Sequence, residues 1–573
     1  MVLRIEGLRV ETQSGTVLVD GVDLELARGE VLGLIGESGA GKSTIGLAAL
    51  TFARPGCRIA DGRIVLQGTD LRSLDARGRS RARGVRVAYV AQSAAAAFNP
   101  AMTLLDQVTE GPVHHGLMSR AAARQRAVEA FRALDLPDPE HFGARYPHQV
   151  SGGQLQRAMA AMAISCSPDV LVLDEPTTAL DVTTQIEMLA HLKKLIALYG
   201  TAALYISHDL AVVAQIADRI MVLRYGKMVE VGTATQILTA PRTDYARALV
   251  AERVAASRSV STSDDTGRGT TLLAIDNLTV RFGERDVVKA ATFTISKGET
   301  VAVVGESGSG KTTLALAICG QVARHSGNVY LADTAPAPRP SGNVQPASAA
   351  LAPGNGDSLR LGGTLLAGRL SRRSREQLRR IQLVFQLPDV ALNPRHTVEA
   401  IIGRPATFYF GLRGAALRAR VTELLAAVGL DASLASRLPG QLSGGQKQRV
   451  CIARALAAKP DLIICDEVTS ALDPLVAEEI LKLLRRLQEE LGLAYLFITH
   501  DLGSVRRISH RAVVMLQGEI VAEGPAAEVF GQPSHPYLIK LLASVPELRV
   551  GWLDEILRGR AGTLAVPNEL ITP

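Results

Sequence analysis

The chain has 573 residues, of which 47% are hydrophobic and 21% charged, with a formal net charge of +7. This length and balance predict two to four globular domains. The five scattered cysteines exclude a zinc-type cluster, the start MVLRIEGLRV lacks a secretory signal, and no apolar run of about 18 residues predicts a membrane-spanning helix.

The first predicted elements are a β-rich opening at 3–10 and a buried strand, VLGLIG, that leads into the loop GESGAGKST at 36–44. This loop matches the phosphate-binding pattern G-x-x-x-x-G-K-[ST], with a helix expected after it. Its glycines allow backbone N–H groups to turn toward phosphate oxygens, and the helix adds its positive end. The residues expected to bind a nucleotide here are Gly36, Ser38, Gly39, Gly41, Lys42, Ser43 and Thr44.

Four further landmarks follow in the first half. The strand RVAYVAQ ends at Gln92, and a helical segment is expected over about 104–135. In VSGGQLQR a serine and two glycines precede a helix, which predicts a second anion site. Later buried strands end in VLVLDE and ISHD. The landmark residues are Gln92, Ser151, Gly152, Gly153, Gln154, Asp174, Glu175 and His208.

Together these residues predict hydrolysis of a nucleoside triphosphate. Lys42 would reach the β- and γ-phosphates, while Ser43 and Asp174 would bind Mg²⁺. Glu175 would polarise the attacking water. His208 would position the γ-phosphate and the water. Gln92 would touch Mg²⁺ or the water and so report the nucleotide state to the helical segment.

The same landmarks recur in order in the second half, so the chain is a tandem duplication. The spacing from Ser151 to Asp174 equals that from Ser443 to Asp466, and the spacing from glutamate to histidine also matches. The equivalent nucleotide-binding residues are Gly305, Ser307, Gly308, Gly310, Lys311, Thr312, Thr313, Gln386, Ser443, Gly444, Gly445, Gln446 and Asp466. The equivalent catalytic residues are Glu467 and His500, and the predicted Mg²⁺ ligands are Thr312, Gln386 and Asp466.

Composition marks the expected boundaries. The stretch 335–356 holds five prolines and little bulk, which predicts a disordered insert in a strand connection. The Ser-, Thr- and Gly-rich stretch 251–271 predicts a flexible linker. The domains are then 1–250 and 272–548, followed by a tail at 549–573. Each domain is expected to be α/β, with a mostly parallel sheet core, an antiparallel β subdomain and a helical subdomain.

This constellation resembles the nucleotide-binding domains of ABC ATPases, over nearly the whole chain twice. The resemblance implies two tandem P-loop NTPase domains of ABC type, with ATP and Mg²⁺ bound. In that family two domains pair head to tail. The SGGQ segment of each domain, called the signature loop, completes the ATP site of the other domain. One chain would therefore supply both ATPase domains. Lys42, Asp174 and His208 would face Ser443–Gln446, and Lys311, Asp466 and His500 would face Ser151–Gln154. Asp181 and Asp473 match the interface loop.

Three segments resemble the importer branch for dipeptides, oligopeptides and nickel: FNPAMTLLDQV at 98–108, LNPRHTVEAI at 392–401 and PSHPYLIKLLASVP at 533–546. The resemblance implies an ATPase subunit at the cytoplasmic face of the inner membrane. Its partners would be two transmembrane permease subunits and, indirectly, an extracytoplasmic solute-binding protein. Some members of the branch carry an iron–sulfur cluster near the last segment. No cysteine follows Cys465, so we expect none.

Several alternatives stay open at this point. The solute could instead be a nickel chelate, a metallophore, glutathione or a peptide antibiotic. A soluble ABC ATPase of translation or DNA repair is a remote alternative, since 251–271 is short and zinc-type cysteine clusters are absent. The basic runs at 77–86 and 369–380 lack interleaved aromatic residues, so we expect no nucleic-acid partner.

One difference between the copies predicts unequal sites. The family usually stacks adenine on an aromatic residue early in each domain. Phe282 fits that position in the second copy, whereas the first copy has Thr12. We therefore expect the site built on Lys42 to bind ATP more weakly than the site built on Lys311.

Overall fold

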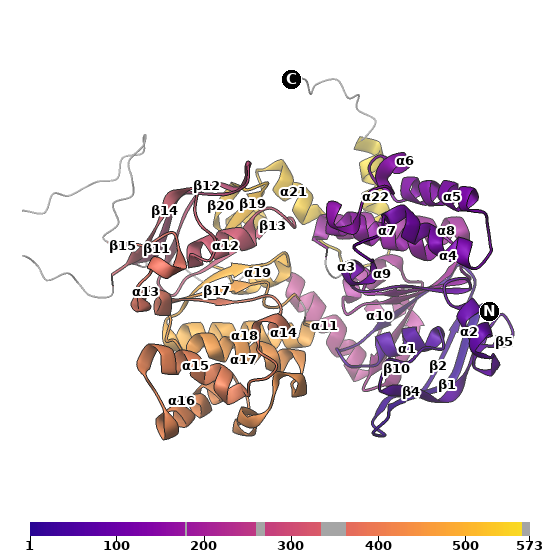
Figure 1. Cartoon of the computed structure of the whole chain (residues 1–573), viewed down its shortest axis with the longest axis horizontal. Coiled ribbons are helices and arrows are strands. Elements are labelled where there is room, and N and C mark those ends of the chain that lie inside the picture. The colour runs from indigo at the N-terminus through magenta and orange to yellow at the C-terminus, as the bar shows by residue number, and fades with distance from the viewer. Residues whose placement is uncertain (178–179, 259–269, 334–362, 471, 564–573) are drawn as a thin grey trace, which may run out of the picture. The chain divides into compact units, whose positions relative to one another are not determined.

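The computed structural model describes residues 1–177, 180–258, 270–333, 363–470 and 472–563, so the expected insert at 335–356 lies outside the described residues. The chain divides into two compact units (Figure 1). Unit 1 comprises Met1–Arg258, Asp473–Leu475 and the end of the chain from Ala543. Unit 2 comprises Ser259–Leu472 and Val476–Leu542.

Unit 1 contains an antiparallel sheet of order β2-β1-β4-β5 and a second sheet of order β10-β9-β3-β8-β7-β6. In the second sheet β10 pairs antiparallel with β9, and the other described pairings are parallel. The strands are β1 (Leu3–Thr12), β2 (Val17–Leu26), β3 (Val31–Ile35), β4 (Cys57–Leu66), β5 (Thr69–Asp70), β6 (Val87–Val90), β7 (Val170–Asp174), β8 (Ala202–Ile206), β9 (Arg219–Arg224) and β10 (Lys227–Thr233).

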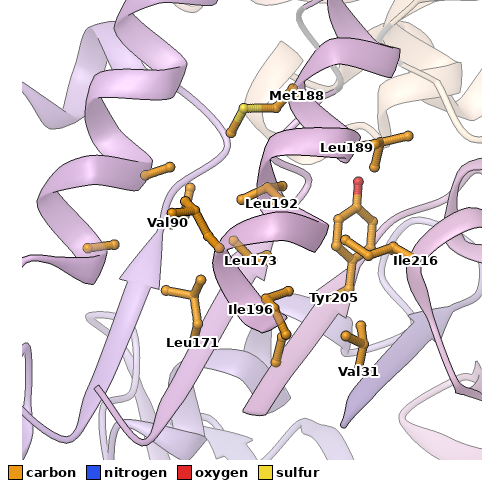
Figure 2. Close-up of a cluster of buried hydrophobic side chains, with 14 of the residues drawn as sticks. Val31, Val90, Leu171, Leu173, Met188, Leu189, Leu192, Ile196, Tyr205 and Ile216 are labelled. Carbon is orange, nitrogen blue, oxygen red and sulfur yellow. The ribbon is translucent and has the colours of Figure 1, made fainter. Parts of the chain in front are cut away.

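The parallel sheet is covered on both faces, which explains why its central strands are continuous apolar runs. Every residue of β7 and β8 is buried. Figure 2 shows one face, where Leu171 and Leu173 of β7 and Tyr205 of β8 lie beneath Leu192 of α8 (Val182–Tyr199). On the other face α1 (Lys42–Ala49) packs against β7 and β8. The sheet thus holds the end of β7 and the start of α1 at fixed positions.

The remaining helices of unit 1 include the expected helical segment, which consists of two helices, α4 and α5, packed on α7. The helix α11 continues through Arg258, so the first part of the expected linker is helical. These helices are α2 (Ala76–Ala82), α3 (Ala94–Ala97), α4 (Leu104–His114), α5 (Arg120–Ala133), α6 (Pro139–Phe142), α7 (Gly152–Ile164), α9 (Leu210–Ile216), α10 (Ala234–Thr239) and α11 (Asp244–Arg258), with short 3₁₀ turns at Leu71–Ser73 and Pro147–Gln149.

The end of the chain also folds into unit 1. The helix α22 (Trp552–Thr563) lies within the range expected as a tail, and Trp552 and Leu553 are buried in the core that surrounds α8 and α9. The Gln215 side chain of α9 donates to the carbonyl oxygens of Glu547 (2.7 Å) and Arg549 (3.2 Å) and accepts from the Leu553 amide (3.1 Å).

Unit 2 repeats this plan, with sheets of order β12-β11-β14-β15 and β16-β17-β18-β13-β19-β20. Its strands are β11 (Thr271–Phe282), β12 (Arg285–Ser296), β13 (Thr300–Gly305), β14 (Ser326–Ala332), β15 (Gly363–Leu365), β16 (Ile381–Val384), β17 (Leu462–Asp466), β18 (Ala494–Ile498), β19 (Arg511–Leu516) and β20 (Glu519–Pro525). Its helices are α12 (Lys311–Cys319), α13 (Arg375–Arg380), α14 (Pro388–Ala391), α15 (Val398–Phe410), α16 (Gly414–Ala427), α17 (Gly444–Leu456), α18 (Pro474–Leu491), α19 (Leu502–Ile508), α20 (Ala526–Gly531) and α21 (Pro536–Ala543), with 3₁₀ turns at Leu370–Arg372, Ala432–Ser436 and Pro439–Gln441.

Candidate active sites

The glycine-rich loop of unit 1 connects β3 to α1, and its backbone requires glycine. Gly36 has a φ of 150°, and a Cβ atom there would lie 2.1 Å from the carbonyl oxygen of Leu223. Gly41 has a φ of 94° and caps α1, which begins at Lys42. The buried Lys42 ammonium donates to the carbonyl oxygens of Gly36 (2.6 Å) and Glu37 (2.9 Å). The loop therefore curls around its own lysine at the start of a helix, as a phosphate cradle requires.

Unit 2 repeats this loop between β13 and α12. Gly308 and Gly310 have φ angles of 80° and 100°. The Lys311 ammonium donates to the carbonyl oxygens of Gly305 (2.9 Å) and Glu306 (2.7 Å).

In unit 1, burial lowers the pKa of Lys42. Neighbouring carboxylates act in the opposite direction and raise this pKa, and Glu175 has the largest effect among them.

A hydroxyl and a carboxylate meet beside each loop. Ser43 Oγ donates to Asp174 Oδ1 at 2.9 Å, and Thr312 Oγ1 donates to Asp466 Oδ1 at 3.2 Å. Both aspartates end buried strands, β7 and β17. Burial raises the pKa of Asp466 to about 6. Hydroxyl and carboxylate oxygens are the ligands that Mg²⁺ prefers, so these two pairs fit the ion.

The glutamate after each aspartate has an unusual backbone conformation. Glu175 and Glu467 have φ angles of 48° and 50°, in the left-handed region that non-glycine residues rarely adopt. Their amides bond the ends of β8 and β18, through the carbonyl oxygens of Ile206 and Ile498 at 2.9 Å. Strain of this kind is characteristic of functional sites. It turns each glutamate away from the course of the preceding strand.

Each glutamate lies between a glutamine and a histidine. Gln92 Nε2 donates to Glu175 Oε2 at 2.9 Å, and His208 Nδ1 lies 3.1 Å from Glu175 Oε1. Because the amide nitrogen of Gln92 binds the glutamate, a contact with Mg²⁺ or water would come from the side-chain oxygen, and this contact stays a prediction.

The arrangement is the same in unit 2. Gln386 Nε2 donates to Glu467 Oε2 at 2.7 Å, and His500 Nδ1 lies 3.2 Å from Glu467 Oε1. Burial lowers the pKa of His208 and His500, but the hydrogen bond and charge of the adjacent glutamate outweigh it, so both pKa values lie above the ordinary one. Each glutamate is therefore held between the side-chain amide of a glutamine and the ring of a histidine, within hydrogen-bonding distance of both.

The two SGGQ motifs begin α7 and α17 with capping boxes. Ser151 Oγ accepts from the Gln154 amide at 3.3 Å, and Gln154 Oε1 accepts from the Ser151 amide at 3.1 Å. Ser443 and Gln446 repeat the pair at 3.3 and 3.0 Å. A Cβ atom at Gly153 would lie 2.7 Å from the Thr184 side chain, so this glycine lets α7 approach α8 closely. The serines are exposed at the helix starts, where an anion would bind.

The two expected adenine positions differ in chemistry as well as in exposure. Phe282 ends β11 and is 53% exposed. Thr12 ends β1, where its hydroxyl lies 2.8 Å from Ser14 Oγ and accepts from the Thr16 amide at 3.0 Å. The Thr12 hydroxyl is thus already used within a turn, whereas the Phe282 ring presents an apolar face.

Sequence reasoning missed several contacts around the first site. Tyr245 Oη, in α11, accepts from the amide of Glu37 at 3.3 Å, and Arg253 of the same helix donates to Asp209 at 3.2 Å. Tyr89 Oη donates to Asp174 Oδ2 at 2.5 Å. The tyrosines are ordinary core residues by sequence pattern, and only the strand and helix packing brings them to these loops.

Comparison with known proteins decides the family. Residues 19–178 and 288–470 match the ABC transporter family. This chain belongs to the ABC transporter ATP-binding proteins. ABC proteins of this kind hydrolyse ATP to drive transport, so the chain is an ABC ATPase. Among the described residues of this ABC ATPase, no helix has the length and apolar character needed to cross a bilayer.

Relatives of this ABC ATPase match along almost its full length. The glutathione import ATP-binding protein GsiA of Salmonella choleraesuis (strain SC-B67) is 37% identical over 591 residues, which cover 95% of this chain and 89% of that protein. GsiA of Escherichia coli (strain K12) is 37% identical over 590 residues, with the same coverage. Residues 521–569 match the C-terminal region of the oligopeptide/dipeptide transporter family. A dimeric ATP-binding cassette, MJ0796, bound to ADP and Pi, matches with 28% identity and a TM-score of 0.35 over 44% of this chain and 99% of its own.

Proposed function

We propose that this chain hydrolyses Mg²⁺-ATP at two sites to power an importer of di- or oligopeptides. The main observation in favour of hydrolysis is that Glu175 and Glu467 have the same unusual backbone conformation and the same two neighbours. Each is strained into the left-handed region between a glutamine and a histidine, directly after the aspartate that fits Mg²⁺.

The geometry suggests how the residues share the reaction. The loop amides and Lys42 would bind the β- and γ-phosphates, with Lys42 exchanging its carbonyl partners for phosphate oxygens. Mg²⁺, when bound to Ser43 and Asp174, would neutralise charge on those phosphates. Glu175 would accept a proton from water as the water oxygen attacks the γ-phosphorus and the bond to the β-phosphate oxygen breaks. Lys311, Thr312, Asp466 and Glu467 would do the same in unit 2.

The glutamines suit a reporting role. Gln92 and Gln386 each bind the glutamate and precede the helices α3 and α14. If nucleotide binding or hydrolysis changes the hydrogen bonds of the glutamate, the glutamine would therefore shift and move the start of the helical subdomain. The completion of each site by the signature loop of the other domain, with Ser443 serving Lys42 and Ser151 serving Lys311, stays a prediction from the family resemblance.

Membrane permeases are the proposed partners. Three apolar side chains beside Gln386 are exposed: Phe385 (37%), Leu387 (51%) and Val390 (83%). Exposed apolar clusters are typical of protein contacts. They support a protein partner at the helical subdomain of unit 2. By resemblance, two permease subunits and an extracytoplasmic solute-binding protein complete the transporter at the cytoplasmic face of the inner membrane.

Peptides are the favoured solute because the C-terminal region matches the oligopeptide/dipeptide transporter family. Glutathione is the second candidate because the relatives with matches over 95% of the chain are named for glutathione import. Both solutes are short, charged and peptide-like. The solute-binding protein and the permeases would recognise the solute. The ATPase chain would supply the energy for transport whichever solute is bound.

Uptake assays test the proposal. Cells lacking the chain would be complemented with the native protein or with Glu175→Gln/Glu467→Gln, then offered a labelled dipeptide, an oligopeptide, glutathione or a nickel chelate. We expect peptide uptake only with the native chain, reduced by unlabelled peptide. If the chain supports uptake of glutathione but not of peptides, the solute is glutathione and the peptide assignment is wrong. Absence of chain-dependent uptake for every solute would overturn the importer assignment.

A further inference from the structure

The two Mg²⁺-binding aspartates have different hydrogen-bond donors. Both oxygens of Asp174 are engaged, Oδ1 by Ser43 at 2.9 Å and Oδ2 by Tyr89 at 2.5 Å. Among the described residues, the side-chain donor to Asp466 is Thr312, at 3.2 Å to Oδ1. The duplicated halves thus hold the same carboxylate in two different ways.

A single residue causes the difference. In unit 1 β6 pairs with β7 in parallel, and Tyr89 lies opposite Val172. Asp174 is two residues beyond Val172 and so on the same face of the sheet, diagonal to Tyr89. Unit 2 has the same register, with Leu383 opposite Ile464. Leu383 packs against the apolar core and has no hydroxyl to offer.

We propose that Tyr89 is a positioning residue of the first site, which orients Asp174 for the divalent cation through a hydrogen bond that the second site lacks. This inference rests on the proposed function, since it assumes that the pair Ser43–Asp174 binds the cation. It assigns to the two sites a difference in cation binding, separate from the expected difference in adenine binding.

The chemistry supports a favourable effect on cation binding. The short O–H···O⁻ bond holds one carboxylate oxygen, while Ser43 holds the other, so the carboxylate plane has one orientation. Mg²⁺ demands near-octahedral geometry and therefore favours a ligand that is already oriented. Hydrogen-bond partners of metal ligands typically change metal affinity by about 10–100-fold when they are removed. Asp466, with one such donor, can turn more freely about its Cβ–Cγ bond.

A simpler role for Tyr89 would be structural, as a core residue whose hydroxyl happens to find a nearby carboxylate. In that case its hydroxyl would affect stability but not the cation. The two roles can be separated, because Tyr89→Phe keeps the ring in the core and removes only the hydroxyl. The second copy supplies the reverse change, Leu383→Tyr.

The test measures binding of Mn²⁺-ADP to the full chain by electron paramagnetic resonance, without turnover. Lys311→Ala silences the second site, and Tyr89→Phe is then compared with Tyr89 in that background. We expect about a tenfold loss of Mn²⁺ affinity at the first site. In the reciprocal Lys42→Ala background, Leu383→Tyr should raise Mn²⁺ affinity at the second site, and Tyr89→Phe should change nothing there.

The outcomes distinguish this inference from the proposed function. Equal or tighter Mn²⁺ binding by Tyr89→Phe, in a protein whose unfolding midpoint shows it folded, would overturn the role of Tyr89 and leave the cation site in place. Failure of both the Lys311→Ala and the Lys42→Ala proteins to bind Mn²⁺-ADP would overturn the proposed function and this inference with it.

Discussion

Gln92 and His208 approach opposite oxygens of Glu175, at 2.9 and 3.1 Å, from segments that are more than 100 positions apart in the sequence. The same three residue types meet at Glu467. The glutamate is therefore the point at which the end of β7, the glutamine segment and the histidine segment are joined.

The first prediction concerns these glutamates. Glu175→Gln and Glu467→Gln each keep the shape of the side chain but remove the carboxylate that we propose as the acceptor of the proton from water. General bases contribute about 10²–10⁴-fold, so each change should remove most hydrolysis at its own site while ATP stays bound. Phosphate release and retention of labelled ATP check this. The double variant should be inactive, and near-normal turnover by it would contradict the assigned base.

The second prediction concerns unequal adenine binding. Base–aromatic stacking is worth about 1–3 kcal/mol in other settings, which corresponds to roughly 5–150-fold in affinity. The Lys42→Ala protein, which keeps the site with Phe282, should therefore bind ATP more tightly than the Lys311→Ala protein. Binding is best measured in EDTA, so that the cation does not contribute.

Phe282→Ala in the Lys42→Ala background is the matched control for stacking. It should remove the advantage and bring ATP affinity near that of the Lys311→Ala protein. Equal affinity of the two single variants, or no effect of Phe282→Ala, would show that the adenine rests elsewhere.

The third prediction concerns a buried carboxylate in unit 1. Glu230 is 7% exposed and accepts hydrogen bonds from the amides of Arg242 and Thr243, at 2.9 and 3.0 Å, and from the Thr243 hydroxyl at 2.9 Å. Burial raises the pKa of Glu230, but these hydrogen bonds outweigh it and the pKa is lowered overall. Thr243 and Glu230 thus join β10 to the start of α11. Glu230→Gln should destabilise unit 1 by about 1–3 kcal/mol, because the amide keeps one acceptor oxygen in place of two and has no charge, so that part of this donor set loses its partner.

The pH dependence of this effect has a definite sign. A carboxylate with a lowered pKa in the folded state stabilises the fold above its unfolded pKa, about 4.3, and loses that contribution as pH falls further. The difference in unfolding midpoint between the native chain and Glu230→Gln should therefore be largest near pH 7 and shrink below about pH 4. Exposed Glu110 in the same unit provides the control Glu110→Gln. A pH-independent difference would contradict the role of the charge.

The fourth prediction concerns the end of the chain. Gln215 is buried and bonds Glu547, Arg549 and Leu553. Gln215→Ala leaves the buried Leu553 amide unpaired, removes two part-buried hydrogen bonds and should cost about 1–3 kcal/mol. Trp552 is the one tryptophan of the sequence and is 3% exposed, so its fluorescence reports the docking of α22 directly. The emission of Gln215→Ala should shift to the red at lower denaturant than that of the native chain.

Lys193→Ala is the control for this segment. Lys193 pairs with Asp554 at 2.7 Å, but both side chains are more than 40% exposed. Exposed ion pairs contribute about 0–1 kcal/mol, so this variant should unfold near the native midpoint. A larger effect of Lys193→Ala than of Gln215→Ala would contradict the account of how α22 is held.

Residues whose partners are close in sequence were predictable. Ser151 and Gln154 are three positions apart, and the glycine-rich loop fixes the start of α1 at Lys42, so local spacing already specifies both structures. Glu175 could be placed at a strand end because a run of four apolar residues precedes Asp174. The α/β fold with two ABC ATPase domains followed from the same motifs and is confirmed by the family match.

Residues whose partners depend on packing were not predictable. Tyr89 and Asp174 are 85 positions apart, and their contact requires β6 to lie beside β7 in one particular register. The range 549–573 reads as a tail because an amphipathic segment gives no sign of the surface it will cover. Gln215 and Leu553, 338 positions apart, meet only after that surface has formed.

The segment around α22 also determines where this duplicated protein can be cut into separately folding parts. Sequence order suggests two self-contained halves separated at 251–271. The polypeptide is instead interleaved, because residues that complete the core of unit 1 follow all of unit 2 in the chain. A first half that stops at Arg258 would uncover the apolar surface occupied by Trp552 and Leu553. During translation, the core of unit 1 therefore cannot close until Trp552 and Leu553 have been synthesised, after unit 2.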